Sequence, residues 1–321
     1  NRSPGWGCSC YSLMMNTIRE RLRRKDEDVE LVEGVSPEEL EHPVDNAPVR
    51  SFSHKGMTIE GYSRAAVQTY WRIPELKLGF DLGLQPWSFM STPNWFVSHA
   101  HLDHIAALPV YVARRRLMKM EPPTIYLPIE AIDPVHALMR AYQRLDRGKQ
   151  VANLVGLEPG MEVELSRELI VSVVPTKHTI PSLGFLVWER RKKLLPEYHT
   201  LSGPEIRDLR LSGVEVTKEI RLPRLAYLGD TNPDGLDSNP AAFDAEVLIL
   251  EMTFVAKGER PDRIHKFGHM HLDDFISRAD RFRNDWIIAS HFSTRLHPDL
   301  IQKIVSRSLP PGLRERVKIW L

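Results

Sequence analysis

The sequence has little cysteine and no long apolar run. Its two cysteines, Cys8 and Cys10, lie one residue apart near the N-terminus. Two cysteines cannot build a disulfide framework, and such a pair alone is a poor zinc site. No stretch approaches the ~18 apolar residues of a membrane-spanning helix. Residues 1–20 show no signal-peptide layout, and we therefore expect a cytoplasmic protein without a membrane partner.

The sequence also lacks a charge of one sign. Its 321 residues carry 43 Lys and Arg against 42 Asp and Glu, for a net charge of +1. Attraction to a nucleic acid must therefore come from local patches of basic residues. Hydrophobic residues make up 42% of the chain and charged residues 26%, which excludes a wholly disordered or collagen-like protein.

The chain divides into a charged beginning and a patterned remainder. Residues 16–45 hold a basic run followed by an acidic one, and blocks of this kind are usually solvated. We expect an N-terminal extension over residues 1–50 that is poorly ordered, and one domain over residues 51–321.

Strands alternate with helical segments over that domain. The apolar pattern predicts strands at 76–81, 95–98, 124–127, 169–175, 184–189, 224–228, 246–251 and 286–290, and helices at 105–118, 134–145 and 271–282. Pro109 is compatible with the helix at 105–118 only near its first turn. This order of elements predicts a layered α/β sandwich.

The strongest chemical signal is the segment from Ser98 to His104. The apolar strand before it ends at Ser98, and the period of two along a strand turns His99 and His101 to the same side. Asp103 and His104 follow on the turn into a helix. Three imidazoles and a carboxylate in so short a segment suit a divalent metal such as zinc.

The spacing His99-x-His101-x-Asp103-His104 resembles the signature of the metallo-β-lactamase superfamily. The resemblance implies an αβ/βα four-layer sandwich with a two-metal site at one edge. The remaining ligands should each follow a strand, and His178, Asp230 and His291 lie in the expected order.

Further motifs are similar to those of ribonuclease Z, in its short, plant-type form. They are Gly229-Asp230-Thr231, Glu251-Met252-Thr253-Phe254, Gly268-His269-Met270-His271 and His291-Phe292-Ser293-Thr294-Arg295. Ribonuclease Z removes the 3′ trailer from precursor transfer RNA. The resemblance implies that substrate, a homodimer, and two Zn²⁺ ions per subunit.

The same resemblance assigns roles to the site residues. It implies His99, His101 and His178 on one zinc, Asp103, His104 and His291 on the other, and Asp230 between them. Asp103 would also orient or deprotonate the attacking water. His269 would give a proton to the departing 3′ oxygen, with Glu251 holding its tautomer. No role for His271 follows from the motif.

A basic cluster at Arg190, Arg191, Lys192 and Lys193 leads into an insertion at about 189–216. Such clusters are most often a solvated face, but this insertion occupies the place of the family's RNA-gripping exosite. Two alternatives stay open. One is a hydrolase of the same fold acting on a small cyclic-nucleotide phosphodiester or thioester, and the other is a non-catalytic RNA-binding scaffold.

Overall fold

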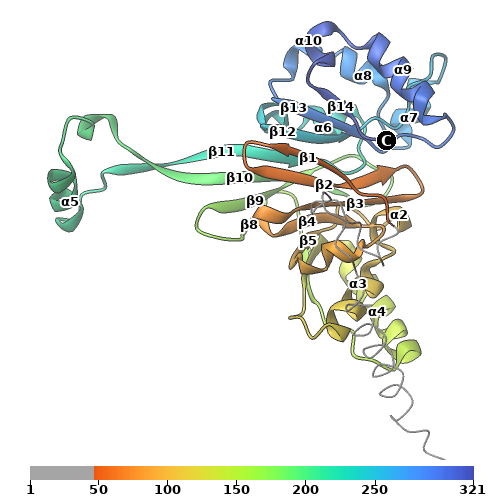
Figure 1. Cartoon of the computed structure of the whole chain (residues 1–321), viewed down its shortest axis with the longest axis horizontal. Coiled ribbons are helices and arrows are strands. Elements are labelled where there is room, and N and C mark those ends of the chain that lie inside the picture. Colours follow the sequence, from red (N-terminus) through yellow and green to blue (C-terminus); the bar gives the residue numbers. More distant parts are fainter. Residues whose placement is uncertain (1–46) are drawn as a thin grey trace, which may run out of the picture. The chain divides into compact units, whose positions relative to one another are not determined.

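The computed structural model describes residues 47–321, which fold into two seven-stranded sheets. The strand order is β1 to β7 in the first sheet, and β14-β13-β12-β11-β10-β9-β8 in the second. Helices flank both sheets (Figure 1). The predicted four-layer α/β sandwich is therefore confirmed. Most of the extension predicted at residues 1–50 lies outside the described residues.

The first sheet is built from the N-terminal half of the domain. Its strands are β1 (Arg50–His54), β2 (Met57–Arg64), β3 (Gln68–Ile73), β4 (Leu78–Leu82), β5 (Asn94–Phe96), β6 (Thr124–Pro128) and β7 (Asn153–Leu157). The helices among them are α2 (Leu102–Ile105), α3 (Leu108–Leu117) and α4 (Ile132–Asp146), with short 3-10 turns η1 (Pro74–Leu76), η2 (Trp87–Ser91) and η3 (Ile129–Ala131).

The second sheet is built from the C-terminal half. Its strands are β8 (Glu162–Glu164), β9 (Leu169–Pro175), β10 (Leu183–Leu194), β11 (Thr217–Tyr227), β12 (Val247–Glu251), β13 (Trp286–Ser290) and β14 (Val317–Ile319). The helices are α5 (Gly203–Leu211), α6 (Pro233–Asp237), α7 (Pro261–Lys266), α8 (Leu272–Ile276), α9 (Pro298–Ser308) and α10 (Pro311–Arg314), with 3-10 turns η4 (Pro196–Tyr198), η5 (Pro240–Asp244) and η6 (Ala279–Arg281).

The central strands are buried on both faces, which explains their continuous apolar sequence. In β5, Phe96 packs between the two sheets whereas Trp95 packs against the helices of the first sheet. In β12, Ile249 packs between the sheets and Leu248 against the outer helices of the second sheet. The period of two along each strand thus divides its side chains between two cores.

Two helical predictions are revised by the structure. The helix predicted at 105–118 is divided into α2 and α3, and Pro109 lies at the start of α3. Proline has no N–H to donate within a helix, so it is tolerated in the first turn only. The helix predicted at 271–282 is short: α8 ends at Ile276 and the 3-10 turn η6 follows.

Strands β10 and β11 continue beyond their neighbours as a two-stranded ribbon. Strand β9 pairs with β10 only as far as Glu189, whereas β10 pairs with β11 out to Leu194 and Thr217. Helix α5 lies at the end of this ribbon (Figure 1). We call residues 189–222 the β10–β11 arm. The insertion predicted at about 189–216 begins inside β10 and ends just before β11, so it includes one strand of the ribbon and α5.

No helix in the part of the chain that the structure describes is long and apolar enough to cross a membrane.

Candidate metal centre

The predicted ligands follow strands, and the fold gathers them at one edge of the sandwich. His99 and His101 follow β5, and His178 follows β9. Asp230 follows β11, and His291 follows β13. Strands β11, β12 and β13 are parallel, so their carboxyl ends meet at the same edge, where ligands of α/β sheets commonly bind.

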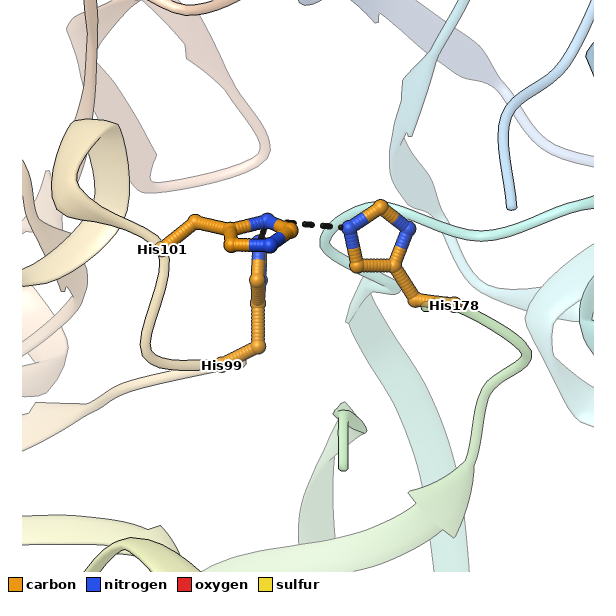
Figure 2. A group of neighbouring side chains, drawn as sticks. All are labelled: His99, His101 and His178. Atoms are coloured by element: carbon orange, nitrogen blue, oxygen red, sulfur yellow. Dashed lines mark hydrogen bonds between the residues drawn. The ribbon is translucent and has the colours of Figure 1, made fainter. Parts of the chain in front are cut away.

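The first group of ligand atoms belongs to His99, His101 and His178. The Nδ1 atom of His101 lies 3.1 Å from the Nε2 atom of His99 and 3.1 Å from the Nε2 atom of His178. Figure 2 shows the three rings turned toward one another from two separate segments of the chain. Three imidazole nitrogens facing one point are the donor set of a zinc-type ion.

A close backbone contact fixes the orientation of His178. Its Nδ1 atom lies 3.0 Å from the carbonyl oxygen of Gly268. A carbonyl can only accept, so Nδ1 carries the proton and the lone pair of Nε2 faces the group. Gly268 has a φ of +73°, and a Cβ atom there would lie 2.6 Å from the Cα atom of His178. Only glycine fits this position without displacing the histidine.

The second group consists of Asp103, His104 and His291. The Nε2 atoms of the two histidines are 3.4 Å apart, and Asp103 Oδ2 lies 3.7 Å from His104 Nε2 and 3.5 Å from His291 Nε2. The backbone N–H of Ala66 also donates to Asp103 Oδ2, at 2.8 Å. This group supplies two nitrogens and a carboxylate, again a zinc-type donor set.

Asp230 lies between the two groups. Its carboxylate oxygens are 3.8 Å from His99 Nε2, 3.5 Å from His104 Nε2 and 3.4 Å from His291 Nε2. Burial favours the neutral form, but the charges of His291 and His104 outweigh it and hold the pKa of Asp230 well below its usual range. An ionised carboxylate in this position has the reach and charge of a bridging ligand.

The protonation states of the first group suit metal binding. Burial lowers the pKa of His99, His101 and His178, which favours the neutral imidazole that a metal requires. For Asp103, burial favours the neutral form, but the hydrogen bond from His291 and the charges of His104 and His291 outweigh it and lower the pKa to about 2. The first group therefore fits a metal in both geometry and charge. In the second group, burial lowers the pKa of His104, but the charges of Asp230 and Asp81 outweigh it and raise the pKa to about 9, so a metal there would displace a proton from this ring.

His269 and Glu251 form the predicted pair beside these groups. The Nδ1 atom of His269 lies 3.1 Å and 3.2 Å from the two oxygens of Glu251, whose side chain is nearly fully buried. The carboxylate only accepts, so Nδ1 carries a proton and Nε2 is the exchangeable atom. Burial opposes the charged ring, but the hydrogen bond and charge of Glu251 outweigh it and raise the pKa of His269 to about 9.

Glu251 also orients a ligand of the second group. The Thr253 hydroxyl donates to Glu251, and its oxygen lies 3.1 Å from the Nδ1 atom of His291. Because the hydroxyl proton is used for Glu251, the oxygen accepts the Nδ1–H of His291, and Nε2 is the ring nitrogen directed at the site. The backbone N–H groups of Thr231 and Met270 donate to the same carboxylate, at 2.7 Å and 3.2 Å.

Asp81 is a site residue that the sequence analysis missed. Its fully buried carboxylate lies 2.7 Å from His104 Nδ1 and accepts from the backbone N–H of Ser98 at 2.6 Å, and from the Tyr227 hydroxyl. It therefore fixes the tautomer of His104. The sequence offered only one indication of this role, which is that Asp81 ends a predicted strand. Its hydrogen-bond partners lie 17, 23 and 146 positions away along the chain, so no local motif contains them.

His271, for which the motif gave no role, begins a helix. Its Nδ1 accepts the N–H of Asp273 at 3.1 Å, and its own N–H donates to Asp274 at 2.7 Å. This capping box satisfies the free N–H groups at the start of α8.

The basic cluster lies on the β10–β11 arm, and its four side chains differ. Arg190 is ion-paired with Glu164, and Arg191 with Glu189. Lys192 and Lys193 are exposed, and neither has an ion pair with another described residue. Successive side chains on a strand face opposite sides, so the cluster does not form one surface.

Comparisons with known proteins agree with this geometry. The family model described as "Beta-lactamase superfamily domain" matches residues 95–292. The chain is 39% identical over 265 residues to tRNase Z TRZ1 of Arabidopsis thaliana, covering 82% of this chain and 94% of that protein. It is 40% identical over 166 residues to the nuclear ribonuclease Z of Triticum aestivum, covering 52% and 94%. The crystal structure of the metallo-β-lactamase fold protein YhfI from Bacillus subtilis is similar with a TM-score of 0.51 at 15% identity, covering 78% and 90%.

Proposed function

The chain belongs to the tRNase Z family of the metallo-β-lactamase superfamily, and from this membership we propose that it removes the 3′ trailer from precursor transfer RNA. It is then a metal-dependent phosphodiesterase that cuts RNA internally. The family predicted from the sequence motifs is confirmed by these matches.

One observation carries the proposal: a histidine held by a buried carboxylate beside two histidine-rich groups. His269 is hydrogen-bonded to Glu251, and its ring centroid lies 5.0 Å from that of His178 and 5.8 Å from that of His291. Phosphodiester hydrolysis needs an oriented water, neutralised charge at phosphorus and a proton for the leaving oxygen. The two groups and His269 offer all three.

The metal in this proposal is zinc, two ions per subunit. His99, His101 and His178 would hold one ion, Asp103, His104 and His291 the other, and Asp230 would contact both. Bound ions of this kind acidify water and neutralise the charge of a phosphate.

The chain's own residues then divide the remaining work. Asp103 orients the attacking water and takes up its proton. His269 gives its Nε2 proton to the 3′ oxygen that leaves phosphorus. Glu251 keeps His269 in the tautomer that presents Nε2, and Asp81 does the same for the ligand nitrogen of His104.

Two further parts of the proposal rest on the family resemblance. The β10–β11 arm contacts the phosphates of transfer RNA at a distance from the cut, which positions the substrate without reading its sequence. The protein also acts as a homodimer, which light scattering of the purified protein tests directly.

The decisive experiment is cleavage of a trailer-bearing precursor transfer RNA with both product ends mapped. We expect a single cut that leaves a 3′ hydroxyl on the transfer RNA. Asp103→Ala should lower turnover by several orders of magnitude, because the water loses its orienting group and the second ion loses a ligand. Turnover of a cyclic nucleotide or a thioester, without cleavage of the precursor, would assign the chain to the small-substrate alternative.

A further inference from the structure

A pocket of about 290 Å³ lies beside His269, and no role in the proposed reaction has been given to it. We call it the arginine–phenylalanine pocket, after Phe254, Arg263, Phe267 and Arg295 in its lining. Its size is just below the usual range for ligand pockets, which is roughly 300–1,000 Å³. It therefore suits a single flat ring system and not a folded segment of RNA.

The pocket is next to His269 through Phe254, and the two ligand groups are next to the same ring. The ring centroid of Phe254 is 6.2 Å from that of His269, whereas His178 and His291 contact the same ring from the ligand groups. Phe267 is two residues before His269 in the chain. A group seated in the pocket is therefore next to the proposed proton donor.

The charges in the pocket are available to a ligand. Arg263 and Arg295 have no carboxylate partner among residues 47–321. The one carboxylate in the lining, that of Glu259, accepts from the backbone N–H of Ala256 at 3.1 Å and lies 3.8 Å from His271. Arg260, which also lines the pocket, is paired with Asp262 at 2.6 Å. The guanidinium of Arg295 lies 5.7 Å from the centroid of the Phe254 ring. Free guanidinium groups bind phosphate in a fork geometry.

An aromatic surface is exposed at the same place. The side chain of Phe267 is 53% exposed, although phenylalanine is usually buried. Aromatic rings next to basic side chains are the usual means by which proteins bind single-stranded nucleic acid, because each base stacks on a ring. The pocket thus combines a stacking surface with two free cations.

The chemistry of the cut decides which nucleotide lies here. In the proposed reaction, the oxygen of water bonds to phosphorus and the bond from phosphorus to the 3′ oxygen breaks. The electron pair stays on that 3′ oxygen, which takes the proton from His269 Nε2. A proton donor must lie within hydrogen-bond reach of the atom it protonates. The nucleotide that carries this 3′ oxygen is therefore the one beside His269.

We propose that the arginine–phenylalanine pocket binds the base of the last nucleotide retained by the transfer RNA, the one immediately 5′ of the cut. The base stacks on Phe267, and Arg263 contacts the phosphate on its 5′ side. This inference rests on the proposed function. It adds a positioning site that holds the leaving 3′ oxygen against His269.

The first test uses the reaction product, so that no cleavage interferes. A transfer RNA that ends at this nucleotide carries 2-aminopurine there, and its fluorescence is measured with the zinc-loaded protein. Stacking quenches 2-aminopurine, so we expect quenching by the wild type and its loss with Phe267→Ala. Arg263→Ala is measured in the same way. Its matched control is Arg307→Ala, because Arg307 is also exposed and lies on α9, outside the pocket. Quenching that is unchanged in Phe267→Ala overturns the inference.

The second test identifies the nucleotide. We expect Phe267→Ala and Arg263→Ala to raise KM for the precursor by about 5-fold to 100-fold, the range for one lost base contact. Zinc content and hydrolysis of bis(p-nitrophenyl) phosphate should not change. The effect of Phe267→Ala should vanish when the precursor is abasic at the last retained nucleotide. If it persists there, or vanishes when the first trailer nucleotide is abasic, the inference is wrong. A wild type that does not cut the precursor at all would instead refute the proposed function.

Discussion

Two buried carboxylates orient the reactive histidines of this site without belonging to either ligand group. Asp81 faces the Nδ1 atom of His104, and Glu251 faces that of His269 and reaches His291 through Thr253. Each leaves the opposite ring nitrogen, Nε2, directed toward the site. Such partners fix the tautomer and raise the basicity of a ligand. The rings are therefore held in their reactive orientation by the folded protein itself.

A prediction at the residue scale concerns the pH dependence of turnover. His269 must be protonated to act as an acid, and its pKa is raised to about 9, with Glu251 as the main raising cause. Activity should therefore fall as the pH rises through this range. Glu251→Gln removes the negative charge, so the pKa of His269 falls and the basic limb of the kcat profile moves to lower pH. The measurement is kcat from pH 6 to 10.

A control and a metal assay separate this effect from damage to the site. Glu315→Gln is the matched variant, because Glu315 is exposed at the end of α10, outside the site and the arginine–phenylalanine pocket. Its basic limb should coincide with that of the wild type. Zinc content is measured in parallel, because Glu251 also orients His291 through Thr253. A basic limb that stays in place in zinc-loaded Glu251→Gln would contradict the assignment of His269.

At the scale of elements, the β10–β11 arm changes which basic residues are available to RNA. The sequence suggested four consecutive residues, but Arg190 and Arg191 are paired with carboxylates. Lys193 lies directly opposite Lys218 on the neighbouring strand. Directly opposed residues share a face of the ribbon, and both lysines are exposed without an ion pair among the described residues. The pair Lys193 and Lys218 is thus the better candidate for a phosphate contact.

This pair leads to a prediction about salt. Replacing both lysines in Lys193→Ala/Lys218→Ala should weaken precursor binding and reduce the slope of log K against log [salt] by up to about 2 units, since each phosphate contact contributes about 0.9 on duplex DNA. Hydrolysis of bis(p-nitrophenyl) phosphate should not change. The charge-matched control is Lys303→Ala/Arg307→Ala on α9, where both side chains are exposed. Equal slopes in the two double variants would leave the arm without a role in phosphate binding.

The elements also show what the sequence could predict. Buried strands such as β9 and β13 have the bounds given by their apolar runs, and the ligands follow directly at strand ends. Strands β1 and β2 escaped prediction because neither holds a continuous apolar run: no residue of β1 is fully buried, and β2 alternates apolar and polar residues over most of its length. Asp81 escaped because a hydrogen-bond network between distant segments leaves no local pattern. The pairing of Lys193 with Lys218 likewise depends on the register between two strands, and the amino-acid sequence of either strand does not show this register.

At the scale of the whole molecule, the ligands come from both sheets. His99, His101 and His104 follow a strand of the first sheet, whereas His178, Asp230 and His291 follow strands of the second. Bound ions would therefore link the two halves of the sandwich. The unfolded chain cannot present these residues at one point, so metal affinity adds to the free energy of unfolding.

The last prediction follows from this link and concerns metal removal. At a free zinc concentration 1,000 times the Kd, one site adds about 4 kcal/mol to the free energy of unfolding. A domain of this size gains roughly 2–4 °C in Tm per kcal/mol, so loss of one ion should lower Tm by roughly 8–16 °C, and a chelator that removes both ions should lower it by about twice as much. His101→Ala, which loses a ligand of one ion, should melt between the wild type and the chelated wild type, and the chelator should lower its Tm by less. His136→Ala, whose side chain is exposed on α4, should behave as the wild type. If calorimetry gives the same Tm for the wild type with and without the chelator, the histidine groups do not hold a metal that joins the two sheets.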